Sequence, residues 1–166
     1  MTETLPWMIE AKKLIGQHEI EGDKDNSTIM QCYKECGHPE IKHDETPWCA
    51  AFVGAMLYRA NLKGTGGLSA REYEGWGVSL KFPIYGCIGV KKRVGSGWVG
   101  HVGFVVAVNP QQIVMLGGNQ GDAVSVAAFD RSQFTAFRWP KEFKIPYPSL
   151  PLPINIKAAK LNVSQS

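Results

Sequence analysis

The hydrophobic period of this sequence changes once along the chain, and this change constrains the fold more than any other feature. Up to Trp76, apolar residues recur at helical spacing, whereas short runs rich in β-branched residues and glycine follow it. Helices that come first and strands that come second are typical of an α+β fold with an antiparallel sheet, and not of alternating βαβ units. We therefore expect N-terminal helices that pack on a small antiparallel sheet.

Helices and strands can be placed from this pattern. The apolar spacing predicts helices over residues 7–15, 27–36, 49–60 and 69–76, with Ser27 and Ser69 as caps of the second and fourth. Strands are predicted over residues 84–90, 99–108 and 112–116, with weaker candidates at 124–126 and 137–139. Residues 1–145 are interpreted as one domain, and the proline-rich segment 146–166 as an extended C-terminal tail.

Composition excludes several classes of function. The 166 residues, 44% hydrophobic and 20% charged, suit one globular domain, and no run approaches the roughly 18 apolar residues of a membrane span, so we expect no membrane insertion. The net charge of +3 is scattered, which gives no reason to expect a nucleic-acid partner. The densest basic cluster, residues 91–93, is interpreted as part of a solvated turn.

The N-terminus has no basic region followed by an apolar one, so it does not resemble a secretory signal. We expect synthesis in the cytoplasm, with delivery by secretion machinery or lysis if the target lies elsewhere.

Four cysteines in a chain of this kind are interpreted as thiols and not as a disulfide framework. Cys32 and Cys36 could form a zinc site with His38 and His43, but their spacing is not one of the usual zinc patterns. Two cysteines stacked one turn apart on a helix explain the pair better. Cys87 is interpreted as a buried strand residue.

Cys49 follows Pro47 and Trp48 and opens an apolar helical run. A thiol at a helix N-terminus is a candidate nucleophile, because the unpaired N–H groups and the helix dipole favour the thiolate. The alternative is that Cys49 is a small buried hydrophobe.

His101 begins the strongest predicted strand, and a hairpin centred on Pro110 places Asn119 opposite it. Directly opposed residues share a face, with Cβ atoms about 5 Å apart. A register slip of one residue would put Gly118 or Gln120 there instead. With Cys49 as nucleophile, His101 as base and Asn119 orienting the ring, these residues form a cysteine-peptidase constellation. The Cys49 backbone N–H would hold an oxyanion together with a second donor that the sequence does not identify.

Three separated motifs resemble CHAP and NlpC-type papain-like cell-wall cysteine peptidases. They are PWCAAFV at residues 47–53, GHVGF at 100–104 and LGGNQGD at 116–122. The resemblance extends upstream and covers roughly residues 7 to 140. The chain is similar to the small bacterial and phage branch of that group, although Cys87 stands where many relatives have an acidic residue.

The resemblance implies a papain-like fold and hydrolysis of a peptidoglycan amide bond through a thioacyl-enzyme, by a peptidoglycan endopeptidase or N-acetylmuramoyl-L-alanine amidase without metal or organic cofactor. Cys49, His101 and Asn119 would be catalytic. Substrate-binding positions implied by the resemblance are Glu19, Trp48, Gln120 and Asp122.

We expect a monomer of the phage-lysin or interbacterial-toxin type, for which a cognate immunity or inhibitor protein is a possible partner. The alternative is an inactive papain-like module that binds a glycan or protein. A cysteine acyltransferase of the permuted relatives fits less well, because its histidine precedes its cysteine.

Overall fold

The computed structural model describes residues 5–20, 25–42, 48–93 and 100–146. The predicted C-terminal tail lies outside this part of the chain from residue 147 onward, so the predicted domain boundary remains a prediction.

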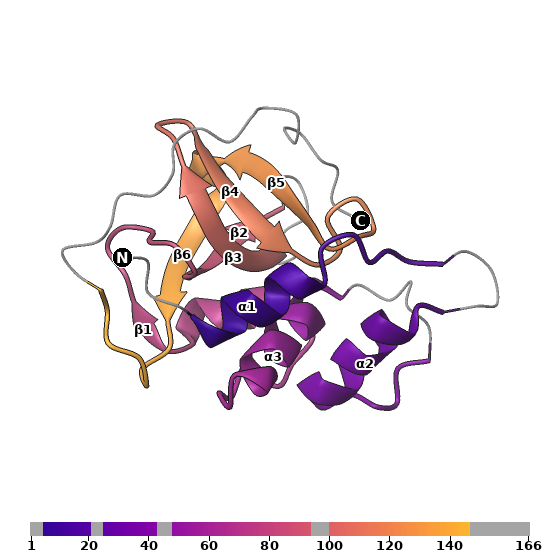
Figure 1. The fold of residues 1–166 in the computed structure, drawn as a ribbon. Coiled ribbons are helices and arrows are strands. Elements are labelled where there is room, and N and C mark those ends of the chain that lie inside the picture. Colours follow the sequence, from indigo (N-terminus) through magenta and orange to yellow (C-terminus); the bar gives the residue numbers. More distant parts are fainter. Residues whose placement is uncertain (1–4, 21–24, 43–47, 94–99, 147–166) are drawn as a thin grey trace.

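Helices come first in the described chain, as the sequence predicts (Figure 1). They are α1 (Pro6–Lys13), α2 (Ser27–Cys36), α3 (Cys49–Arg59) and the short 3-10 helix η1 (Ala70–Gly75). All three α-helices lie on the same side of the sheet in Figure 1, and α3 packs against α1, α2 and strand β3. Within the described residues, none of the helices has the length and apolar character needed to cross a bilayer.

One antiparallel sheet follows the helices. Its strands are β1 (Val78–Ser79), β2 (Ile88–Lys92), β3 (Gly100–Val108), β4 (Gln112–Gly117), β5 (Ser125–Asp130) and β6 (Phe134–Trp139). The spatial order is β1-β6-β2-β3-β4-β5, and every neighbouring pair is antiparallel. A second 3-10 helix, η2 (Arg131–Gln133), joins β5 to β6. The α+β class with an antiparallel sheet is therefore confirmed.

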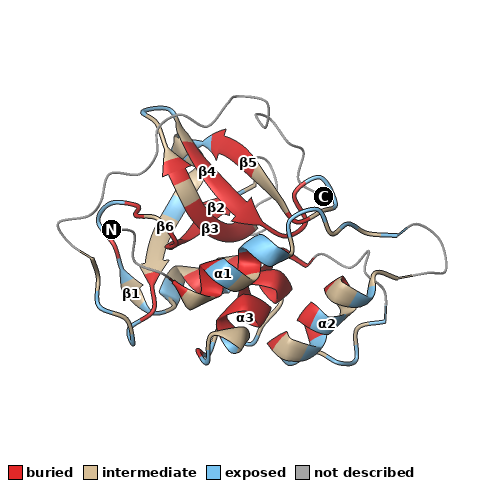
Figure 2. Ribbon diagram, viewed as in Figure 1, coloured by how far each residue is buried: buried red, intermediate tan, exposed pale blue. Residues whose placement is uncertain are grey.

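Helix α3 forms the centre of the core. Each residue from Cys49 to Leu57 is buried, and Figure 2 shows this helix almost entirely in the colour of buried residues. Its Phe52 ring meets Phe104 of β3 with centroids 6.2 Å apart. A helix that is apolar on all sides has to be enclosed on all sides. The position of its first residue is therefore fixed by the surrounding elements.

Three local predictions were wrong. The cap of α2 is Asn26 and not Ser27, because the side-chain Oδ1 of Asn26 accepts from the Thr28 and Ile29 N–H groups at 2.8 and 3.2 Å. Strand β2 runs two residues beyond Val90, and Cys87 lies just before it. Lys91 is thus a buried strand residue and not part of a solvated turn, because β2 lies between β6 and β3 in the sheet.

Candidate active site

Cys49 is the first residue of α3 and is 7% exposed. Burial raises the pKa of its thiol. Hydrogen bonds from the backbone N–H groups of Val102 and Ala50, and the positive charge of Arg93, oppose that shift only in part. The helix start therefore does not by itself make Cys49 a thiolate, and the nucleophile needs a base to take its proton.

The start of strand β3, which carries His101, lies beside this thiol. The sulfur accepts from the N–H of Val102, the residue that follows His101. The ladder between β3 and β4 ends at the pair Phe104–Leu116, so the first residues of β3 extend beyond its last pair with β4. The N-terminus of α3 meets β3 there. The start of α3, which carries Cys49, thus lies against the start of β3, which carries His101, while the catalytic roles of the two residues remain predictions.

A hydrogen bond fixes the tautomer of His101. The two amide hydrogens of Gln120 point to the carbonyl oxygens of Met115 (3.2 Å) and Ser125 (2.8 Å), so its Oε1 is left to accept. This oxygen lies 2.9 Å from Nε2 of His101. An amide oxygen can only accept, and therefore Nε2 carries the hydrogen. In the neutral ring the lone pair then sits on Nδ1, which is the atom able to act as a base.

The hairpin register was predicted correctly near the site, but the residue that meets the His101 ring differs. Phe104 pairs with Leu116 and Val105 with Met115, as a turn centred on Pro110 requires. Beyond Gly117, however, the strand alternation ends, because Asn119 adopts a left-handed conformation with φ 59°. The adjacent Gln120 bonds His101 Nε2, and Asn119 is buried beside it. The catalytic role of Asn119 remains a prediction.

Two glycines allow this close approach. A Cβ added to Gly117 would lie 2.5 Å from Oε1 of Gln120. A Cβ on Gly118 would lie 2.7 Å from the Trp48 ring and from Phe52. The segment that carries Asn119 and Gln120 therefore packs directly on the start of α3, with no room for larger side chains.

Polar side chains are buried around His101, and the burial of one of them, Lys91, was not predicted from the sequence. Lys91 is 3% exposed, His101 2%, Asn119 4% and Gln120 1%. Lys91 stands directly opposite His101 across β2 and β3. Extending the predicted strand by one residue would have found it, since that extension continues the buried run of β2.

Burial, more than any other influence, lowers the pKa of His101 to about 4. The positive charges of Lys91 and Arg93 lower it further, while the bond to Gln120 opposes the shift. The imidazole is therefore neutral near pH 7, the state in which it can accept a proton.

The four positions that the resemblance implies for substrate binding fall in different environments. The Glu19 N–H donates to the Asp122 carbonyl at 2.9 Å, which places these two residues next to each other beside the β4–β5 connection, with Asp122 exposed. Trp48 is fully buried and packs on Gly118, so it supports the turn and does not line a groove. Gln120 is buried and its side chain is bonded to His101. This geometry therefore does not favour contact between the Gln120 side chain and a substrate.

Within the described residues, no group of three or more side chains is arranged to hold a metal ion. Cys32 and Cys36 are buried on α2 as a stacked pair. His38 instead bonds the Gly66 carbonyl at 2.7 Å and the Glu40 carboxylate at 2.8 Å. His43, the fourth residue of the zinc alternative, lies outside the described residues.

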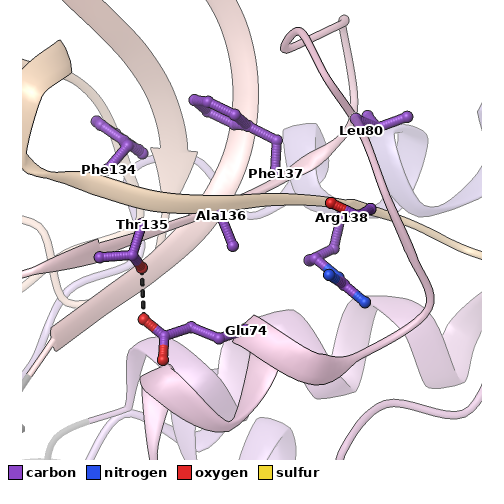
Figure 3. Close-up of a pocket in the computed structure, with 8 residues that line it drawn as sticks. Glu74, Leu80, Phe134, Thr135, Ala136, Phe137 and Arg138 are labelled. Atoms are coloured by element: carbon purple, nitrogen blue, oxygen red, sulfur yellow. Dashed lines mark hydrogen bonds between the residues drawn. The ribbon is translucent and has the colours of Figure 1, made fainter.

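A pocket of about 460 Å³ lies along β6, between η1 and the segment around Leu80 (Figure 3). Its polar groups bind one another or the backbone. Glu74 accepts from Thr135 and pairs with Arg71, and Arg138 donates to the Trp76 and Gly77 carbonyls. The pocket is lined by none of the buried polar residues around Cys49, and its polar groups serve the fold.

Comparison with known proteins agrees with this geometry. The family model described as "CHAP domain" matches residues 41–119, a segment that contains Cys49, His101 and Asn119 and ends one residue before Gln120. No curated protein sequence matches the chain. CHAP domains are in general cysteine- and histidine-dependent amidases or peptidases that act on peptidoglycan. With its nucleophile candidate on a helix and its histidine on an antiparallel sheet, the chain is consistent with a CHAP-type cell-wall cysteine peptidase, which the match over residues 41–119 supports.

Proposed function

We propose that this protein hydrolyses an amide bond in the peptide stem or cross-link of peptidoglycan through a thioacyl intermediate on Cys49. The observation that carries this proposal is the fixed tautomer of His101, whose Nε2 is bonded to Gln120 so that Nδ1 holds the lone pair. A neutral thiol beside a neutral imidazole of this tautomer is a nucleophile paired with its base.

In the first half of the reaction, Nδ1 of His101 takes the thiol proton while the Cys49 sulfur attacks the carbonyl carbon of the scissile amide. The oxyanion that forms lies near the start of α3, where the Cys49 backbone N–H is a donor. The tetrahedral intermediate then collapses: the C–N bond breaks, the imidazolium gives its proton to the leaving amine, and a thioester remains.

In the second half, water attacks the thioester carbonyl and gives a proton to His101. The C–S bond breaks, the carboxylic acid leaves, and the proton returns to the sulfur. The histidine acts as base and then as acid in each half, which is why its ring must keep one orientation throughout.

The test uses isolated sacculi treated with the wild type, Cys49→Ala and a control, Cys32→Ala, which removes a buried thiol on α2. We expect wild type and control to release muropeptides and Cys49→Ala to be slower by about a thousandfold or more. Mass spectrometry of the products identifies the bond by its new amine and carboxylate. Equal release by Cys49→Ala, or binding to sacculi without any release by the wild type, would overturn the proposal in favour of a binding module.

We also propose that the enzyme works in the setting of a phage lysin or an interbacterial toxin and reaches the wall after lysis or secretion. Expression in a bacterial host with and without a fused periplasmic leader tests this. Lysis only with the leader, absent in Cys49→Ala, is the expected result. Lysis without any leader would contradict it. A toxin of this kind calls for an inhibitor protein in the cell that produces it.

A further inference from the structure

Lys91 is a buried cation next to the candidate catalytic pair. It lies on β2, in the interior of the sheet, and is 3% exposed. Taking an ammonium group out of water costs free energy unless other groups stabilise it. Among the ion pairs of the described residues none involves Lys91, and the group over which its Nζ lies is an aromatic ring. A buried charge of this kind calls for an explanation.

The ring in question belongs to Phe129 of β5. Nζ of Lys91 lies 5.0 Å from its centroid, a distance at which a cation interacts favourably with an aromatic face. The His101 ring lies 5.5 Å from the same centroid. Lys91 and His101 are also direct partners in the β2–β3 ladder, so their side chains share one face of the sheet. The ammonium and the imidazole therefore occupy the same enclosed space.

Further ionisable groups lie near this space. Arg93, two residues after Lys91, acts on both Cys49 and His101. Tyr73 of η1 lies close enough to Cys49 for a negative charge on the thiol to raise the pKa of the tyrosine. Arg71 of η1, whose side chain lies against Gly100, is paired with Glu74 at 3.1 Å. The net charge contributed by these groups and Lys91 is positive.

We propose that Lys91 is a positioning residue that keeps His101 unprotonated, so that the resting site holds a neutral thiol and a neutral imidazole and not a thiolate–imidazolium pair. This inference rests on the proposed function. A second positive charge in the same enclosed space would be repelled by the ammonium, so the imidazole binds its proton weakly until a negative charge develops on the substrate.

The electrostatics agree with this geometry. Among the charges that act on His101, Lys91 comes first, ahead of Arg93, and each lowers its pKa. Burial lowers the pKa of Lys91 itself to about 8, so the ammonium is largely charged at neutral pH.

The experiment compares the full-length wild type with Lys91→Met, which keeps the length of the side chain and removes its charge. Lys92→Met is the matched control, because Lys92 is the next residue of β2 but is exposed. The titration of His101 is followed by NMR. We expect the wild type to bind its proton well below the range of a free imidazole. Lys91→Met should bind the proton about tenfold more tightly, a shift of about one pH unit, with the control unchanged.

The pH profile of kcat/KM gives a second measure, with its acid limb moving upward by the same amount in Lys91→Met. Lys91→Arg, which keeps the charge, should titrate like the wild type. If Lys91→Met does not fold, Lys91→Gln takes its place and is compared with Lys91→Arg. A wild-type His101 that titrates near 6.5, or one whose titration does not respond to loss of the charge, overturns the inference. Because the titration needs no turnover, a shifted titration in a protein without activity would disprove the proposed function alone.

Discussion

At the scale of single residues, two neighbouring side-chain amides are candidates for the group that orients the His101 ring. Asn119 and Gln120 are both buried near His101, and sequence register alone favours Asn119. The structure gives the ring contact to Gln120, because the left-handed backbone at Asn119 ends the strand alternation. A one-residue difference of this kind depends on a backbone angle that sequence pairing does not report.

This difference can be tested by activity. Gln120→Ala should lower kcat on a muropeptide by about ten- to a hundredfold, since the His101 ring loses the group that fixes its tautomer. KM should change less. Asn119→Ala should cost less activity, and Gln111→Ala, at an exposed turn position, should cost none. A larger loss for Asn119→Ala than for Gln120→Ala would restore Asn119 as the orienting residue.

At the scale of elements, the helix starts were easier to predict than the groups that cap them. Helix α2 begins at Ser27, yet its cap is the preceding Asn26, whose amide also donates to the Gln17 side chain and the His18 carbonyl. One side chain therefore ties the start of α2 to the segment that leads toward Glu19. Sequence offers two acceptable capping residues in a row, and only the backbone geometry decides between them.

Removing the cap should destabilise the protein. Asn26→Ala should lower the free energy of unfolding by about 1 kcal/mol, because two N–H groups at the start of α2 lose their acceptor. Ser27→Ala, at an exposed position, should stay within about 0.5 kcal/mol of the wild type. Urea unfolding at constant m-value measures both. A larger loss for Ser27→Ala would show that the cap lies one residue later.

At the scale of the whole molecule, the buried ionisable groups couple stability to pH. Burial lowers the pKa of His101 to about 4 in the folded protein, against 6.5 for a free imidazole. Between these values the unfolded chain holds a proton that the folded chain does not. Stability therefore rises with pH across this window and falls as pH drops from 6.5 toward 4. Lys91, lowered to about 8, adds the same sign between 8 and 10.5.

The His101 contribution is about 3 kcal/mol at most. It is measured by urea unfolding of wild type and His101→Gln at pH 4.5 and pH 7. The variant should lose less stability on acidification than the wild type, while carboxylates contribute equally to both. His18→Gln, which removes an exposed histidine, should follow the wild type. Equal loss in wild type and His101→Gln would mean that His101 binds its proton equally well in the folded and unfolded states.

The sequence by itself determined the order of helices and strands, the placement of Cys49 at a helix start and of His101 at a strand start, and the hairpin register near Phe104. These follow from the period of apolar residues, which is a local property. Only the tertiary structure decided that Gln120 holds the ring and that Lys91 is buried opposite it. The contact of Gln120 depends on where the β3–β4 ladder ends, and the burial of Lys91 depends on which side chains the strands bring against Phe129. Both are contacts between residues far apart in the sequence, which no local pattern of apolar residues encodes.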